Sequence, residues 1–121
     1  MVTQSERFMG RYARRVAERR VKHYITGFCE GFPVEELQYA ADNNLPIVQK
    51  LLTMFLLKPG KEEVSRQQAQ PYRWLFDEIA TVENVVRLFH EVSPQHAGVL
   101  ESHPQWLESQ IRTARIQVFG T

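Results

Sequence analysis

Apolar and polar residues recur along the chain with a helical period, most clearly between Tyr72 and Val92. At about 100° per residue, the polar side chains of this segment fall on one narrow strip, and two apolar stripes cover most of the remaining circumference. The first stripe has heptad-like spacing and consists of Tyr72, Leu75, Ile79, Val82, Val86 and Phe89. The second consists of Trp74, Thr81, Val85, Leu88 and Val92. The pattern predicts a central amphipathic helix over about 72–92, with both stripes in the protein's own core or the second stripe against another chain.

Further helices are predicted on both sides of the central one. The first spans about Glu6 to Ile25, and its apolar residues change face half-way, so its first half could project onto another subunit. Gly27 is a candidate stop for this helix. A capping-box pattern from Ser102 to Gln105 predicts the start of a last helix, after a short helical turn broken at Gly98.

Between these elements, the segment 37–52 predicts two helices joined by a polar turn. It resembles one unit of an ankyrin repeat in Leu37, Ala40, Ala41, Asn43, Val48, Leu51 and Leu52. At least about three stacked units are needed for an independent solenoid, so the segment is interpreted as a generic αα-hairpin. Residues 61–70 are nearly all polar and predict either an exposed helical turn or a linker. We therefore expect an all-α fold, a compact bundle of five or six short helices around the central helix, in a single domain spanning residues 1–121.

Composition is consistent with one globular domain that functions in the cytoplasm. The chain has 121 residues, of which 43% are hydrophobic and 24% charged, enough for one core without metals or disulfides. The longest apolar run, Leu45 to Leu57, is shorter than the roughly 20 residues that cross a bilayer. The N-terminus lacks the pattern of a secretory signal. A single cysteine, Cys29, cannot form an internal disulfide, which fits a reducing compartment.

Few residues in the sequence indicate catalysis or metal binding. The histidines His90, His96 and His103 do not have the spacing of a zinc site. Phosphate-binding glycine motifs and the nucleophile elbow do not occur in the sequence, and Cys29 has no identifiable base near it. We expect no cofactor, no metal and no enzymatic activity.

Charge is distributed unevenly along the chain. Residues 1–30 contain seven Lys and Arg against three Glu, a net charge of +4, and residues 31–121 contain eight against eleven, a net charge of −3. The predicted basic surface of the first helix consists of Arg7, Arg11, Arg14, Arg15, Arg19 and Lys22. Three interpretations remain open for it: an ordinary solvated face, a docking surface for an acidic protein, or a surface for nucleic acid.

The helices together carry more apolar surface than a small bundle readily covers, which predicts a homodimer or the capture of a partner. The predicted interface residues are Phe8, Met9, Tyr12, Met54, Phe55, Trp74 and Leu88. Aromatic residues and methionine are favoured at interfaces, although each also occurs in cores.

In size, helical pattern and lack of catalytic motifs, the chain resembles small bacterial anti-activators. This resemblance implies a non-enzymatic regulator that binds a transcriptional regulator and blocks its dimerisation or DNA binding. The alternative is a nucleic-acid-associated protein that uses the basic residues between Arg7 and Lys22.

Overall fold

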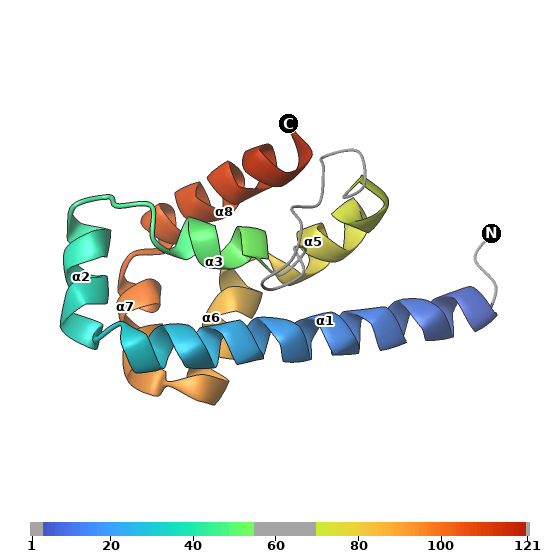
Figure 1. The fold of residues 1–121 in the computed structure, drawn as a ribbon, viewed down its shortest axis with the longest axis horizontal. Helices are drawn as coiled ribbons and strands as arrows, with labels where there is room; N and C mark the ends of the chain where they lie inside the picture. Colours follow the sequence, from blue (N-terminus) through green and yellow to red (C-terminus); the bar gives the residue numbers. More distant parts are fainter. Residues whose placement is uncertain (1–3, 55–69, 121) are drawn as a thin grey trace.

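The computed structural model describes the backbone of residues 4–54 and 70–120 and the side chains of residues 11–53 and 70–120 (Figure 1). Over these ranges the chain forms seven α-helices, one short 3-10 helix and no strand, which confirms the all-α prediction. The elements are α1 (Gln4–Gly31), α2 (Val34–Asp42), α3 (Val48–Met54), η1 (Gln70–Tyr72), α5 (Arg73–Ile79), α6 (Val82–Val92), α7 (Pro94–Ser102) and α8 (Pro104–Phe119). Of the expected linker 61–70, only Gln70 lies inside the described residues.

The first helix is longer than its sequence signals indicate. It continues through Gly27 and ends at Gly31, just before Pro33. Its buried residues Val21 and Ile25 are followed on the same face by Phe28, whose ring stacks on Phe32 at 5.0 Å. This packing outweighs the roughly 1 kcal/mol that a glycine costs inside a helix. The N-terminal turns of α1 extend beyond the other helices along the long axis of the molecule (Figure 1).

The predicted central helix over 72–92 is broken into two helices. The break lies at Ala80 and Thr81, where Thr81 takes an extended backbone conformation and caps α6. The Thr81 hydroxyl accepts a hydrogen bond from the Asn84 backbone N–H at 3.1 Å, and the Asn84 side chain donates to the Ile79 carbonyl at 2.9 Å. These side chains satisfy one backbone N–H and one backbone carbonyl at the break.

The C-terminal third differs from the prediction in its helix ends. Gly98 lies inside α7 instead of breaking it, and Ser102 does not cap α8 because its hydroxyl donates to the Gly98 carbonyl at 3.0 Å. The last helix, α8, extends to Phe119. Gly120 ends that helix with a φ of 84°, a left-handed conformation that glycine adopts without strain.

The helices bury their apolar faces against one another, and α6 and α7 each pack on more than one neighbour. The contacting pairs are α1 with α6, α3 with α8, α6 with α7, and α2 with α7. The predicted αα-hairpin is therefore wrong, because α2 and α3 pack on different helices and not chiefly on each other. The largest fully buried side chains include Phe76, Ile79, Leu88 and Phe89, so α5 and α6 supply the centre of the core from both predicted stripes. None of the described helices is both long and apolar enough to cross a membrane.

Candidate functional site: the outward face of α1

The predicted interface residues separate into buried, exposed and undescribed groups. Leu88 is 0% exposed, so its inclusion was wrong: it packs in the protein's own core. Tyr12 and Trp74 are 59% and 45% exposed and remain candidates for contact with a partner. The side chains of Phe8, Met9 and Met54, and all of Phe55, lie outside the described residues, as does the side chain of Arg7.

Two of the predicted basic residues are used by the fold itself. Arg14 lies 3.6 Å from Glu18 on α1 and 3.5 Å from Glu78 on α5. Lys22 lies 3.2 Å from Glu91 on α6. Both cations therefore face the helices that pack against α1, and both meet a carboxylate there.

These ion pairs continue through Arg87 of α6, which contacts Glu18 at 2.7 Å and Glu91 at 3.2 Å. The hydrogen bond from Lys22 lowers the pKa of Glu91 below its ordinary value of 4.5, and Arg87 acts in the same direction. The set Arg14, Lys22, Arg87, Glu18, Glu78 and Glu91 contains three cations and three anions, so its net charge is zero. This neutral network joins α1 to α5 and α6 and leaves no spare positive charge for a ligand.

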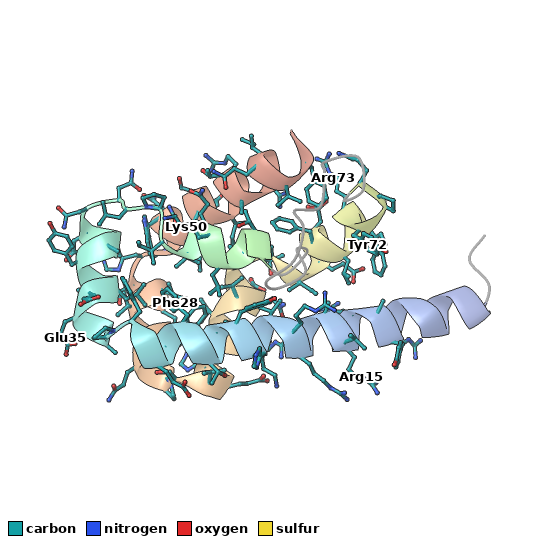
Figure 2. All side chains as sticks on the ribbon, viewed as in Figure 1. Arg15, Phe28, Glu35, Lys50, Tyr72 and Arg73 are labelled. Carbon is teal, nitrogen blue, oxygen red and sulfur yellow. The ribbon has the colours of Figure 1, made fainter. Side chains whose placement is uncertain are left out.

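The remaining arginines of α1 have a different environment. Arg11, Arg15, Arg19 and Arg20 are exposed, and within the described residues none of them forms an ion pair with a carboxylate. Figure 2 shows Arg15 extending from α1 away from the other helices. The positive charge of this part of the helix is therefore not compensated by the described part of the fold.

Exposed Tyr12 and Val16, together with His23, lie between these arginines. At about 100° per residue, Tyr12, Val16 and His23 lie within about 40° of one another, and Arg15 and Arg20 lie on opposite sides of that line. Val16 is 37% exposed although it is aliphatic, whereas Val21, on the opposite side of the helix, is 2% exposed. We define the outward face of α1 by the following residues: Arg11, Tyr12, Arg15, Val16, Arg19, Arg20 and His23.

Sequence reasoning found only part of this surface. It assigned Tyr12 to a predicted interface and Arg11, Arg15 and Arg19 to a predicted basic surface, and neither set included Val16, Arg20 or His23. The spacing from Tyr12 through Val16 and Arg19 to His23 is 4, 3 and 4 residues, a heptad-like signal that was present in the sequence. The signal was hidden because Tyr12 and Val16 were grouped with neighbouring residues of the first half of the helix as one apolar stripe.

A second exposed aromatic group lies on α5 and η1. Tyr72 is exposed, and Trp74 precedes Glu78 by four residues on α5. Residues four apart lie on one side of a helix, and Glu78 pairs with Arg14, so Trp74 lies on the side of α5 that faces α1. This aromatic pair is a possible extension of the interface, separate from the outward face.

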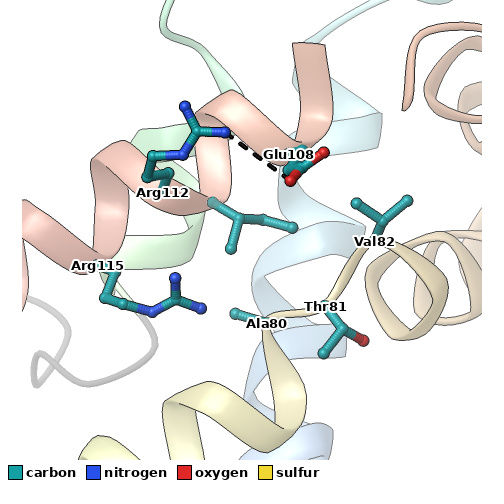
Figure 3. A pocket seen from close by; sticks show the side chains of 7 residues that line it. Ala80, Thr81, Val82, Glu108, Arg112 and Arg115 are labelled. Atoms are coloured by element: carbon teal, nitrogen blue, oxygen red, sulfur yellow. Dashed lines mark ion pairs between the residues drawn. The ribbon is translucent and has the colours of Figure 1, made fainter. Parts of the chain in front are cut away.

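A hollow lies elsewhere among the described residues, between α8 and the corner that joins α5 to α6 (Figure 3). It has a volume of about 270 Å³ and is lined in part by Thr81, Glu108, Arg112 and Arg115. Arg112 lies 3.8 Å from Glu108, and Arg115 donates to Asp77 at 2.9 Å while its guanidinium lies over the Phe76 ring. Because both guanidinium groups already meet carboxylates, the hollow offers no uncompensated charge to an anionic ligand.

The histidines serve as links between helices. His96 is buried, and its Nε2 donates to the Phe32 carbonyl at 2.7 Å while its Nδ1 accepts from the Ser93 hydroxyl at 2.7 Å. His90 contacts Glu101, and His103 contacts Asp42 at 3.0 Å. No group of three or more potential metal ligands occurs in the part of the chain that the structure describes.

Cys29 lies near the end of α1 and is partly buried. Burial raises the pKa of its thiol from 9.0 to about 11, so the nucleophilic thiolate is scarce at neutral pH. This environment is typical of a structural cysteine.

No protein-family model matches the chain, and no curated protein or solved structure shows significant similarity to it.

Proposed function

We propose that this protein is a small non-enzymatic regulator or adaptor that binds another protein through the outward face of α1. The observation that carries the proposal is the contrast on α1: Arg14 and Lys22 are neutralised within the fold, whereas Arg15 and its neighbours on the outward face are not. An anti-activator, which covers the dimerisation or DNA-binding surface of a transcriptional regulator, is the form of this function that the sequence favours.

The residue types on this face support a protein partner. Tyrosine and arginine are the types that most often carry binding energy at protein interfaces, because each combines a large contact area with directed polar groups. Tyr12 and Arg15 are separated by one helical turn, and Val16 adds aliphatic surface beside them. A partner that covers this face would bury apolar area and pair the arginines at the same time.

Self-association is a separate proposal and would require a different surface. Two copies joined through the outward face would bring two sets of four uncompensated arginines together, which is unfavourable for a pair of like-charged surfaces. A homodimer would instead use exposed residues such as Tyr72 and Trp74. Light scattering at tens of micromolar measures the mass directly, and Trp74→Ala should return such a dimer to a monomer.

Nucleic-acid binding is the second candidate, and one observation favours it. Arg11, Arg15 and Arg19 are four residues apart and form a row of guanidinium groups at about 6 Å intervals along the helix. Such a row suits phosphates, and binding by it would weaken steeply as salt concentration rises.

A capture experiment separates these functions. Tagged full-length protein is incubated with nuclease-treated lysate of its own organism, in wild-type form, as the Arg15→Glu, Arg19→Glu double variant, and as an Arg112→Glu control on α8. We expect a protein that is retained in stoichiometric amount by wild type and control and lost by the double variant. Retention of that protein by all three forms would contradict the proposed face. Capture that occurs from a parallel untreated lysate but not from the nuclease-treated one would favour nucleic acid.

A further inference from the structure

We propose that the partner presents an acidic amphipathic α-helix, which packs lengthwise on the outward face of α1. This inference rests on the proposed function, because it specifies the partner element that the same face would bind. Three features of the face support it: the line of its apolar side chains, the sign and position of its charges, and its accessibility.

Two exposed apolar side chains and a histidine form a line that suits a helix. Tyr12, Val16 and His23 follow the heptad-like spacing of 4 and then 7 residues, with Arg19 at the intervening position. Side chains at this spacing stay on one side of an α-helix over about three turns, and they interdigitate with an apolar stripe on a second helix. The exposure of Tyr12 and Val16, 59% and 37%, leaves both available to that stripe.

The arginines of α1 indicate which charges should flank the apolar stripe of the partner helix. Arg11 and Arg15 lie on one side of the Tyr12 to Val16 line, and Arg20 lies on the other. Arg15 and Arg20 occupy the edge positions from which helices in contact form ion pairs that decide partner choice, and Arg11 lies farther round the helix. A partner with carboxylates on both edges of its apolar stripe would pair with the arginines, and a second copy of this chain, which brings arginines instead, would not.

Val16 distinguishes this partner from nucleic acid. The row of arginines alone would suffice for phosphates, and stacking on bases requires aromatic or guanidinium planes, which an aliphatic valine does not have. Covering Val16 removes apolar surface from water only if the partner is itself apolar at that point.

The path for a partner helix is open along α1. The side chain of Arg15 points away from the body of the molecule (Figure 2), and the N-terminal turns of α1 extend past the other described helices (Figure 1). A second helix can approach this face along the turns around Tyr12 and Arg15, and farther along α1 the Lys22–Glu91 ion pair places α6 beside one edge of the face.

The test uses the full chain and a synthetic probe. The probe is a fluorescent peptide of about three heptads with leucine at positions a and d and glutamate at positions e and g, titrated with the protein and followed by anisotropy. A peptide of the same composition in scrambled order, a peptide with lysine in place of glutamate, and a single-stranded oligonucleotide serve as comparison ligands.

We expect the acidic amphipathic peptide to bind at least about tenfold more tightly than either control peptide and the oligonucleotide. Val16→Ser and the Arg15→Glu, Arg19→Glu double variant should each weaken it by about tenfold or more, while Arg112→Glu leaves it unchanged. Circular dichroism confirms that each variant keeps its helices. Equal binding of the scrambled peptide, no effect of Val16→Ser, or tighter binding of the oligonucleotide would each overturn the inference.

The capture experiment tests the proposed function separately from the peptide titration. If the double variant loses a cellular protein but the acidic peptide does not bind wild type, the face binds protein and the acidic helix is the wrong element. If the double variant loses no protein, the proposed function fails, whatever the peptide does.

Discussion

The two sides of α1 carry the same kinds of charged residue in different environments. Where α1 meets α5 and α6, Arg14 and, at the edge of the outward face, Lys22 contact carboxylates of three other residues and form part of a neutral network. On the outward face, arginines such as Arg15 meet no carboxylate among the described residues and surround exposed Tyr12 and Val16. The same helix thus contributes one side to the fold and leaves the other available for binding.

This difference shows that a count of charges along the sequence overstates the basic surface. The net charge of +4 in residues 1–30 includes cations that the fold neutralises. What remains is a narrower face with apolar residues at its centre. Such a face is suited to a partner that is both acidic and apolar, and less to a uniformly charged one.

The largest loss of stability is expected for Leu88, a predicted interface residue that lies in the core. Leu88→Ala should lower the free energy of unfolding by about 3 kcal/mol, because it removes a fully buried side chain from α6 and leaves a cavity. Tyr12→Ala on the outward face should change it by less than about 0.5 kcal/mol. Urea denaturation followed by circular dichroism measures both, and similar losses for the two variants would contradict the division into core and binding face.

A matched pair of valines on α1 tests the same division on one helix. Val21→Ala should cost about 2 kcal/mol of unfolding free energy, from lost apolar burial and a small cavity. Val16→Ala should stay within about 0.5 kcal/mol of wild type, since its side chain remains partly in water. The two substitutions are chemically identical, so a comparable loss at both positions in urea denaturation would place Val16 in the core and remove it from the binding face.

Substitutions of paired and unpaired arginines should change the stability of the protein by different amounts and in different directions. Arg87→Met should destabilise the protein by about 1 kcal/mol, because it breaks the ion pairs with Glu18 and Glu91. Arg15→Met should leave stability unchanged or raise it by up to about 0.5 kcal/mol, since it relieves repulsion from Arg11 and Arg19 four residues away. Thermal unfolding at low and high salt measures both effects, and the loss for Arg87→Met should shrink as salt screens the pairs. A loss for Arg15→Met equal to that for Arg87→Met would show that the outward arginines also stabilise the fold.

The smallest effect is expected in the pH dependence of stability. The pKa of Glu91 is lowered in the folded protein, so its contribution is present above its ordinary value of 4.5 and is lost as pH falls below that value. Glu91→Gln should therefore flatten the decline of unfolding free energy below about pH 4.5. Glu83→Gln is the control, because Glu83 has no ion pair within the described residues. An unchanged slope for Glu91→Gln would mean that its pairing with Lys22 does not stabilise the fold.

The sequence predicted which segments are helical more reliably than where the helices end. Apolar periodicity located most elements, because this signal is local. Periodicity did not reveal the break at Ala80 and Thr81, since the apolar stripes continue across it and only the capping role of Thr81 marks it. Likewise, Gly27 signalled a helix end that packing around Phe28 overrides.

The candidate site was predictable only in outline. The sequence revealed that the first helix is rich in arginine. Which of its cations form ion pairs depends on contacts between residues far apart in the sequence, such as Lys22 with Glu91 and Glu18 with Arg87. Similarly, the exposure of Val16 and burial of Leu88 depend on which side α6 packs against, and a pattern along one helix does not contain that information.

The central claim is that the outward face of α1 is the binding surface, and amide chemical-shift mapping tests it most directly. Isotope-labelled full-length protein is titrated with the acidic amphipathic peptide, and the shift of each backbone amide is followed. The largest changes should fall on residues 11–23, with little change in α8 around Arg112. Changes centred on α8, or spread evenly over the molecule, would contradict the account.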